Sequence, residues 1–247
     1  MSQLHKTKCV VVKTVKYGES SLIISAYTEL FGVQSYLINN VRVSGKKGSG
    51  KANLFQPGSI LEMIVYHNEL KNLQRIKECK WGYLYQHIFS DVIKNAVVLF
   101  MVEMIQKCVK QPEANPHLFS FIEESLIQAD RSNEKIVANF PLYFAIHLAT
   151  FFGFQLQDNF STSKNIFDLK EGFFVSEKPE HPYFIDGKLS EVLSDLLKIM
   201  QPGELIQLSL NHEIRRALLN NLQIFYALHM QDFGQLKSLV VLQEVLN

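Results

Sequence analysis

Residues 45–51, Gly-Lys-Lys-Gly-Ser-Gly-Lys, match the first seven positions of the phosphate-binding pattern G-x-x-x-x-G-K-[ST]. In that pattern the glycine-rich backbone and the lysine hold nucleotide phosphates, and the final hydroxyl binds magnesium. The eighth residue here is Ala52, which has no hydroxyl, and Pro57-Gly58 arrive too early for the helix that normally faces the phosphates. A nucleotide-hydrolysing switch is therefore disfavoured, although an ATP-dependent activity would revive it.

A basic loop that follows a phosphate backbone explains the same segment better. Arg42, Lys46, Lys47 and Lys51 lie in residues 33–61, a window without Asp or Glu. Each neutralised phosphate releases counterions, so such binding weakens steeply with salt. The alternative is a solvated loop that keeps a sheet edge soluble. Further phosphate contacts are predicted at Lys13, Lys16 and Arg75.

Aromatic side chains accompany these cations, and rings of this kind stack on nucleic-acid bases without sequence preference. Tyr17, in a predicted turn, and Tyr36, next to the basic loop, are the predicted stacking residues. The alternative is that most aromatic rings of this region belong to the core.

No pattern for metal binding or catalysis is present. The eight histidines are scattered without an H-E-x-x-H motif, and no G-x-S-x-G sequence occurs. Cys9, Cys79 and Cys108 lie far apart, which favours reduced, buried thiols. We therefore expect no metal, no cofactor and no enzymatic activity.

Arg215, Arg216 and Lys237 stand out in an otherwise acidic C-terminal half. An arginine beside an apolar helix face is suited to capture an acidic, hydrophobic peptide. Intramolecular salt bridges explain the two arginines equally well. The three residues are the predicted partner-binding site.

Five short β-branched segments separated by turn residues must position the N-terminal cations. They are predicted at residues 7–15, 20–28, 33–38, 59–66 and 73–80. Five strands in about eighty residues are typical of an OB-fold barrel, a common nucleic-acid platform. Residues 1–80 are therefore the predicted DNA-binding domain.

Helical periodicity follows, so residues 81–247 are predicted to form a mostly α-helical domain. Helices are expected at residues 83–110, 116–129, 141–152, 189–200, 212–230, with Asn211 as N-cap, and 236–246. Residues 154–187 form an irregular insertion with a predicted hairpin between 172–175 and 183–185. The fold class is thus α+β, with a domain boundary near residues 80–82.

Charge divides in the same way. Residues 1–80 carry twelve Lys or Arg against five Asp or Glu, a balance of +7, whereas the remainder has a balance of −6. Only the first part is thus expected to face a polyanion, although chance fluctuation would give a similar split. No apolar run of membrane-spanning length and no secretory signal are recognised, so a cytoplasmic protein is expected.

The ordered motifs resemble the RecO family over almost the whole chain. They are Val10-Val11-Val12-Lys13-Thr14, Tyr17-Gly18-Glu19-Ser20-Ser21, Tyr27-Thr28-Glu29-Leu30-Phe31-Gly32, Leu54-Phe55-Gln56-Pro57, Phe167-Asp168-Leu169-Lys170-Glu171-Gly172 and the C-terminal helices with Arg215-Arg216. Each motif alone is short, and the order of the set is what makes the resemblance specific.

The resemblance implies an OB-fold joined to a helical domain in a nucleoid-associated recombination mediator. It implies binding of single- and double-stranded DNA, annealing of complementary strands, and partnership with RecR and with the C-terminal tail of single-stranded DNA-binding protein, which lead to recombinase loading. Many members bind zinc through four cysteines around the F-D-L-x-x-G motif, but residues 154–186 contain no cysteine here. Aromatic packing of Phe167, Phe173, Phe174 and Phe184 is expected in its place. An RNA-binding OB-fold protein and a protein-only adaptor remain as alternatives.

Overall fold

The computed structural model describes residues 3–39, 41 and 52–246. The chain divides into two compact units, and the division passes through helices α2 (Val92–Cys108) and α3 (Pro116–Arg131). The first unit is Met1–Gln86 with Ile105–Ile127, and the second is His87–Met104 with Gln128–Asn247. The proposed domain boundary near residues 80–82 stays a prediction.

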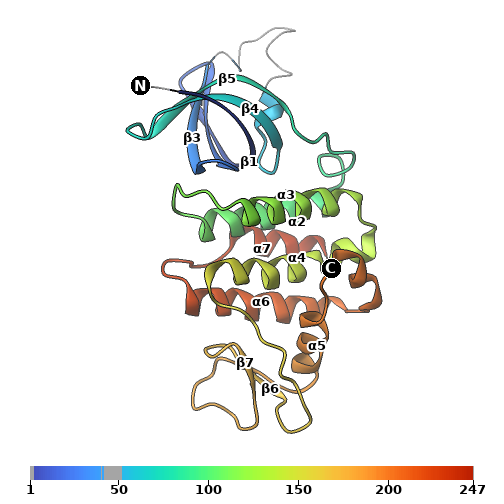
Figure 1. Cartoon of the computed structure of the whole chain (residues 1–247). Coiled ribbons are helices and arrows are strands. Elements are labelled where there is room, and N and C mark those ends of the chain that lie inside the picture. Colours follow the sequence, from blue (N-terminus) through green and yellow to red (C-terminus); the bar gives the residue numbers. More distant parts are fainter. Residues whose placement is uncertain (1–2, 40, 42–51, 247) are drawn as a thin grey trace. The chain divides into compact units, whose positions relative to one another are not determined.

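The first unit contains a closed five-stranded barrel (Figure 1). Its elements are β1 (Gln3–Tyr17), β2 (Ser21–Thr28), β3 (Gly32–Ile38), η1 (Asn53–Phe55), β4 (Ile60–His67) and β5 (Leu73–Trp81). The strands follow the order β1-β2-β3-β5-β4, and only the β3–β5 pairing is parallel. This is the strand order of an OB-fold, so the predicted N-terminal barrel is confirmed.

Alternating side chains fill the barrel. Cys9 and Val11 of β1, Ile24 of β2, and Met63 and Val65 of β4 are at most 1% exposed and pack in one cluster. The other face of these strands is mixed: Lys6, Lys13 and Tyr66 are exposed, whereas Val10 and Tyr27 are fully buried.

The second unit is mostly helical (Figure 1). It contains α4 (Glu134–Ala149), η2 (Thr150–Phe152), β6 (Ile166–Asp168), β7 (Phe173–Val175), β8 (Phe184–Ile185), α5 (Gly187–Leu197), η3 (Pro202–Gln207), α6 (His212–His229) and α7 (Lys237–Val245), together with parts of α2 and α3. Helix α4 packs against α6, where the buried Tyr226 hydroxyl donates to the Ala145 carbonyl at 2.7 Å. The predicted α+β class, with a helical part after the barrel, is therefore confirmed.

Two predicted helix starts were wrong because side-chain caps override the periodicity. Helix α2 begins at Val92 rather than near residue 83, since the Asp91 carboxylate accepts from the Lys94 amide at 3.0 Å. Helix α4 begins at Glu134 rather than at Pro141, since Asn133 caps it. In contrast, the predicted cap at Asn211 is confirmed.

The predicted hairpin between residues 172–175 and 183–185 was also wrong. Strand β6 lies between β7 and β8 and pairs with both in antiparallel fashion. Phe167 of β6 pairs with Phe174 of β7 on one side and with Ile185 of β8 on the other, so β7 and β8 do not pair with each other. Strand β6 belongs to the buried F-D-L segment. Its backbone N–H and C=O groups need hydrogen-bond partners on both sides, and β7 and β8 supply them.

Glu134–Phe152, which comprises α4 and η2, is long and apolar enough to cross a membrane by length and composition. Within its most apolar window, 61% is buried inside the structure. Among the described helices it is the one that qualifies, and a buried core helix passes the same test.

Candidate nucleic-acid interface

Three barrel lysines form ion pairs with two carboxylates. Lys6 and Lys80 approach Glu62 at 3.6 and 3.2 Å, and the hydrogen bond from Lys80 holds the pKa of Glu62 below its usual range. Lys8 contacts Glu123 of α3 at 2.9 Å, a hydrogen bond that raises the pKa of the lysine. These cations are occupied and are poor candidates for phosphate contacts.

Five other cations of the barrel are exposed, and none has an ion pair within the described part of the chain. They are Lys13, Lys16, Lys71, Arg75 and Lys77. Lys13, Lys16 and Arg75 were predicted phosphate contacts, whereas Lys71 and Lys77 were missed by the sequence reasoning. Lys77 follows Arg75 by two positions in β5, and this alternation was the signal available for finding it.

A β-bulge turns Lys13 of β1 outward. The pairing of β1 with β2 shifts between Val11 and Lys13, so the chain gains one residue there. Beyond the bulge, Lys13, Val15 and Tyr17 are exposed, the latter two by 47% and 55%. The β1–β2 hairpin therefore presents two exposed cations, Lys13 and Lys16, and the accessible ring of Tyr17. The stacking role of Tyr17 stays a prediction.

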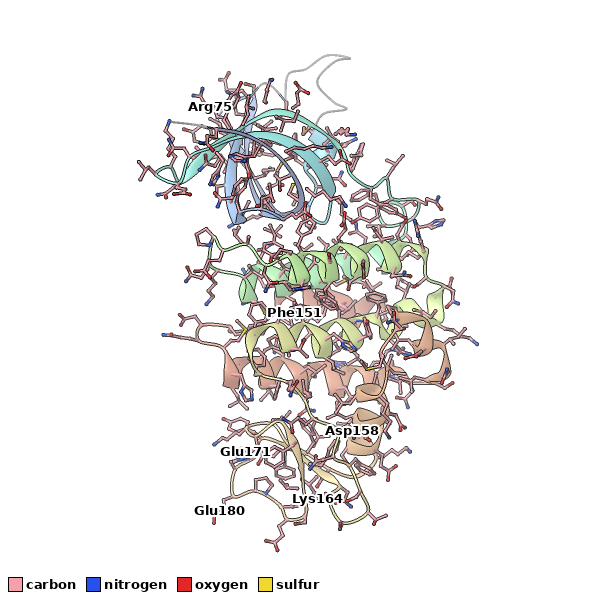
Figure 2. The ribbon with its side chains drawn as sticks, in the orientation of Figure 1. Arg75, Phe151, Asp158, Lys164, Glu171 and Glu180 are labelled. Atoms are coloured by element: carbon pink, nitrogen blue, oxygen red, sulfur yellow. The ribbon has the colours of Figure 1, made fainter. Side chains whose placement is uncertain are left out.

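Two hollows adjoin along β5, and Leu37 and Arg75 line both. Arg75 is labelled on the barrel in Figure 2. The first hollow is also lined by Tyr66, Lys71, Leu73 and Gln74, and the second by the β5 residues Ile76–Cys79 with apolar side chains from β3 and η1. A second bulge, at Lys77, interrupts the pairing of β5 with β4. The result is a groove of mixed polarity, in which apolar side chains lie beside the β5 cations and beside Glu78.

Tyr36 does not lie at this surface. It is completely buried in the barrel core, its hydroxyl has no hydrogen-bond partner among the described residues, and burial raises its pKa. The predicted stacking role of Tyr36 is therefore wrong. Its register explains the error: Tyr36 pairs with Gln74, which also points inward, whereas Leu37 pairs with the exposed Arg75.

The predicted contacts Arg42, Lys46, Lys47 and Lys51 lie outside the described residues. The chain is described again from Ala52, where a short 3-10 turn leads to Pro57-Gly58 and β4. The sequence predicted that no long helix follows the glycine-rich segment, and the residues from Ala52 onward agree with this.

Comparison with known sequences decides the family. Residues 1–85 match the family described as "Recombination protein O N terminal", and residues 90–239 match "Recombination protein O C terminal". The chain belongs to the RecO family of DNA repair proteins.

Proteins named DNA repair protein RecO are similar to this RecO chain over nearly its full length. The protein from Christiangramia forsetii is 32% identical, with 97% of this chain and 98% of that protein covered. The protein from Azobacteroides pseudotrichonymphae is 30% identical, with 98% and 99% covered. The protein from Flavobacterium psychrophilum is 32% identical, with 97% and 98% covered.

The predicted partner-binding residues of this RecO chain do not form one cluster. Arg215 is half-buried and donates to the carbonyls of Leu210 and Leu246, whereas Arg216 is exposed. Burial lowers the pKa of Arg215. Lys237 lies at the start of α7, whereas Leu246, which Arg215 contacts, follows the end of that helix. The nine residues of α7, at roughly 1.5 Å per residue, therefore separate Lys237 from the Leu246 contact. Arg216 is thus the accessible arginine of the pair.

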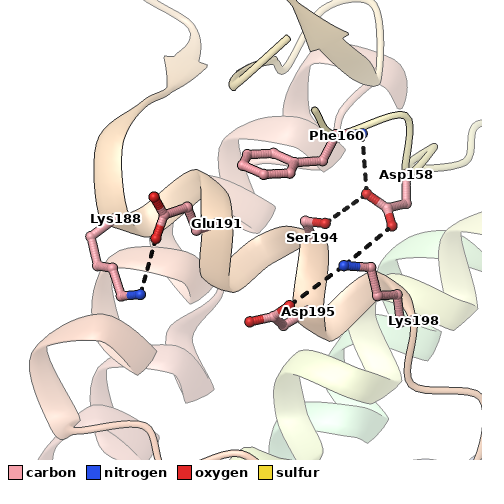
Figure 3. Close-up of polar contacts among 7 residues, drawn as sticks. All are labelled: Asp158, Phe160, Lys188, Glu191, Ser194, Asp195 and Lys198. Carbon is pink, nitrogen blue, oxygen red and sulfur yellow. Dashed lines mark hydrogen bonds and ion pairs between the residues drawn. The ribbon is translucent and has the colours of Figure 1, made fainter. Parts of the chain in front are cut away.

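Polar side chains hold the insertion that carries zinc in many RecO proteins. Asp158 accepts from the Ser194 hydroxyl at 2.8 Å and lies 3.9 Å from Lys198, which ties the insertion to α5 (Figure 3). The Asn159 amide donates to the Phe174 carbonyl at 3.0 Å and accepts from the Phe174 amide at 2.7 Å. The Asn159 side chain therefore pairs with the backbone of β7 as a neighbouring strand would.

The aromatic packing expected in this insertion is present only in part. Phe167 and Phe174 are at most 1% exposed and meet edge-to-face at 4.9 Å, whereas Phe173 and Phe184 are only half-buried. No group of three or more His, Cys, Asp or Glu within the described chain is arranged to hold a metal. Without the cysteines, this donor set does not fit the zinc of other family members.

Proposed function

We propose that this protein binds single- and double-stranded DNA through the barrel and anneals complementary strands in the cytoplasm, at the nucleoid. The observation that carries the proposal is the division of the barrel cations. Carboxylates occupy Lys6, Lys8 and Lys80, whereas the cations of the hairpin tip and of β5 have no such partners among the described residues. Free cations beside exposed apolar side chains are the combination that single-stranded nucleic acid requires.

Annealing follows from charge neutralisation. Two complementary strands repel each other through their phosphates, and bound cations lower that repulsion while bases stay accessible. The mechanism requires no nucleotide hydrolysis and no catalytic group. The protein would thus act as a mediator rather than an enzyme.

The direct test is annealing of two labelled complementary oligonucleotides without ATP, at low and moderate salt. Acceleration that fades as salt rises is the expected result. If the protein neither binds DNA at low salt nor accelerates pairing, the proposal fails and a protein-only adaptor takes its place. Stronger binding to RNA of the same sequence would instead favour the RNA-binding alternative.

The second unit is the proposed docking site for protein partners. The tail of single-stranded DNA-binding protein is acidic and apolar, and Arg216 lies at a small hollow that is also lined by Leu219, by Gln243 of α7 and by Leu246. An accessible arginine beside apolar side chains suits such a peptide. RecR is the further partner that family membership supports, and together these contacts would lead to recombinase loading.

Titration with a labelled tail peptide tests the docking site. Arg216→Ala is expected to weaken binding at least several-fold, whereas the matched change Lys135→Ala, at an exposed cation of α4, leaves it unchanged. Arg215→Ala is less informative, because Arg215 also holds two backbone carbonyls. Equal affinity of the Arg216 and Lys135 variants would exclude the arginine site.

A further inference from the structure

Four residues form one row across four strands of the barrel. The registers pair Leu4 of β1 with Tyr66 of β4, Tyr66 with Arg75 of β5, and Arg75 with Leu37 of β3. Residues directly opposite each other in neighbouring strands project from the same face of a sheet. An apolar side chain, an aromatic ring, a guanidinium and a second apolar side chain therefore stand side by side.

This row faces outward. Leu4 and Tyr66 are 51% and 39% exposed. The adjacent positions on the inner face are closed, because Val65 and Tyr36 are fully buried and Gln74 is 2% exposed. The row is thus part of the barrel surface and contributes nothing to the core cluster.

The surrounding residues extend the same chemistry. Leu73, two positions before Arg75, is 39% exposed and lines the same hollow as Tyr66 and Lys71. Neither cation of this hollow has a carboxylate partner in the described structure. Exposed apolar groups gathered in a hollow beside cations can contact a ligand that has both an apolar face and negative charge.

The ligand must match both features. A flat apolar surface on Tyr66 and its leucine neighbours suits the face of a nucleobase, and Arg75 with Lys71 suits the phosphates on either side of it. A duplex buries its base faces in the stack, so an unstacked base of a single strand is the fitting ligand. A purely electrostatic groove would have no use for the apolar row.

We propose that Tyr66, Leu37 and Leu73 form a base-stacking subsite, with Arg75 and Lys71 holding the adjoining phosphates. This inference rests on the proposed binding of single-stranded DNA and adds the place where the protein reads a base rather than a charge. Such a subsite would bind a single strand more tightly than a duplex.

Abasic DNA separates stacking from charge, because it keeps every phosphate and lacks the bases. Binding of a short thymidine oligonucleotide and of its abasic counterpart is measured over a range of salt. The wild type is expected to prefer the base-containing strand, and Tyr66→Leu to lower that preference by about tenfold without changing the salt slope. Tyr66→Phe, which keeps the ring, retains the preference.

Arg75→Gln is the complementary variant. It is expected to reduce the salt slope by about 0.7 while the preference for bases persists. If Tyr66→Leu binds both strands as the wild type does, the subsite is overturned while DNA binding stands. If the wild type binds neither strand, the proposed function itself fails, and the subsite with it.

Discussion

The hairpin tip allows a test of whether position or total charge governs DNA affinity. In the double variant Lys13→Gln/Lys16→Gln, two cations without carboxylate partners in the described structure are removed from an exposed tip. In the control Lys6→Gln/Lys80→Gln, two cations that flank Glu62 are removed from the same barrel. Both variants change the net charge by −2. Only the first removes cations that have no carboxylate partner among the described residues.

The expected magnitude follows from counterion release. Each single-strand phosphate contact contributes about 0.7 to the slope of log affinity against log salt, so loss of two contacts reduces the slope by about 1.4. Between 1 M and 0.1 M salt this amounts to roughly a 25-fold loss of affinity at the lower salt. The control leaves Glu62 unneutralised, yet its slope is expected to stay close to that of the wild type.

Fluorescence anisotropy of a labelled oligonucleotide at several salt concentrations measures both quantities. Identical losses in the two variants would show that the summed charge of the barrel sets affinity. An unchanged slope for Lys13→Gln/Lys16→Gln would remove the hairpin tip from the interface.

Three further predictions concern stability, each measured by thermal or denaturant unfolding. Asn159→Ala is expected to lower the free energy of unfolding by about 1–2 kcal/mol, because the side chain makes two hydrogen bonds to the backbone of β7. The control Asn165→Ala, in the same insertion, is expected to change it little, and equal effects of the two variants would contradict this account. Gly32→Ala is expected to destabilise more than Gly18→Ala, since both have φ near +60° but a Cβ at Gly32 would collide with backbone that precedes α3. Burial lowers the pKa of His147 below 6.5, so the unfolded chain takes up the proton first and stability falls as pH drops below about 6.5. His147→Gln should flatten that dependence, and an unaltered pH profile would refute its origin.

The barrel was predictable because its strands obey local rules. Strand β5 begins at the predicted Leu73 and ends one residue beyond the predicted end, and turn glycines separate the other strands. The long helices after α2 were also found from periodicity. The predicted starts of α2 and α4 failed at Asp91 and Asn133, where a side-chain cap sets the boundary and the apolar pattern carries no information about it.

The candidate site was predictable only in part, because it depends on register and pairing. Whether Tyr36 or Leu37 faces outward follows from the partners of β3, which no local pattern reveals. The bulge before Lys13 likewise changes which side chains face outward. Ion pairing decides which cations are free, and the partner of Lys8 lies 115 residues away in the chain. Such long-range contacts exist only in the folded chain.

Photo-crosslinking of single-stranded DNA that carries bromodeoxyuridine tests the central claim most directly. After digestion, mass spectrometry identifies the peptides attached to DNA. Crosslinks in the peptides of the β1–β2 hairpin and of β4–β5, including Tyr17 and Tyr66, are the predicted result. Crosslinks confined to the second unit, His87–Met104 and Gln128–Asn247, would contradict the assignment of DNA binding to the barrel.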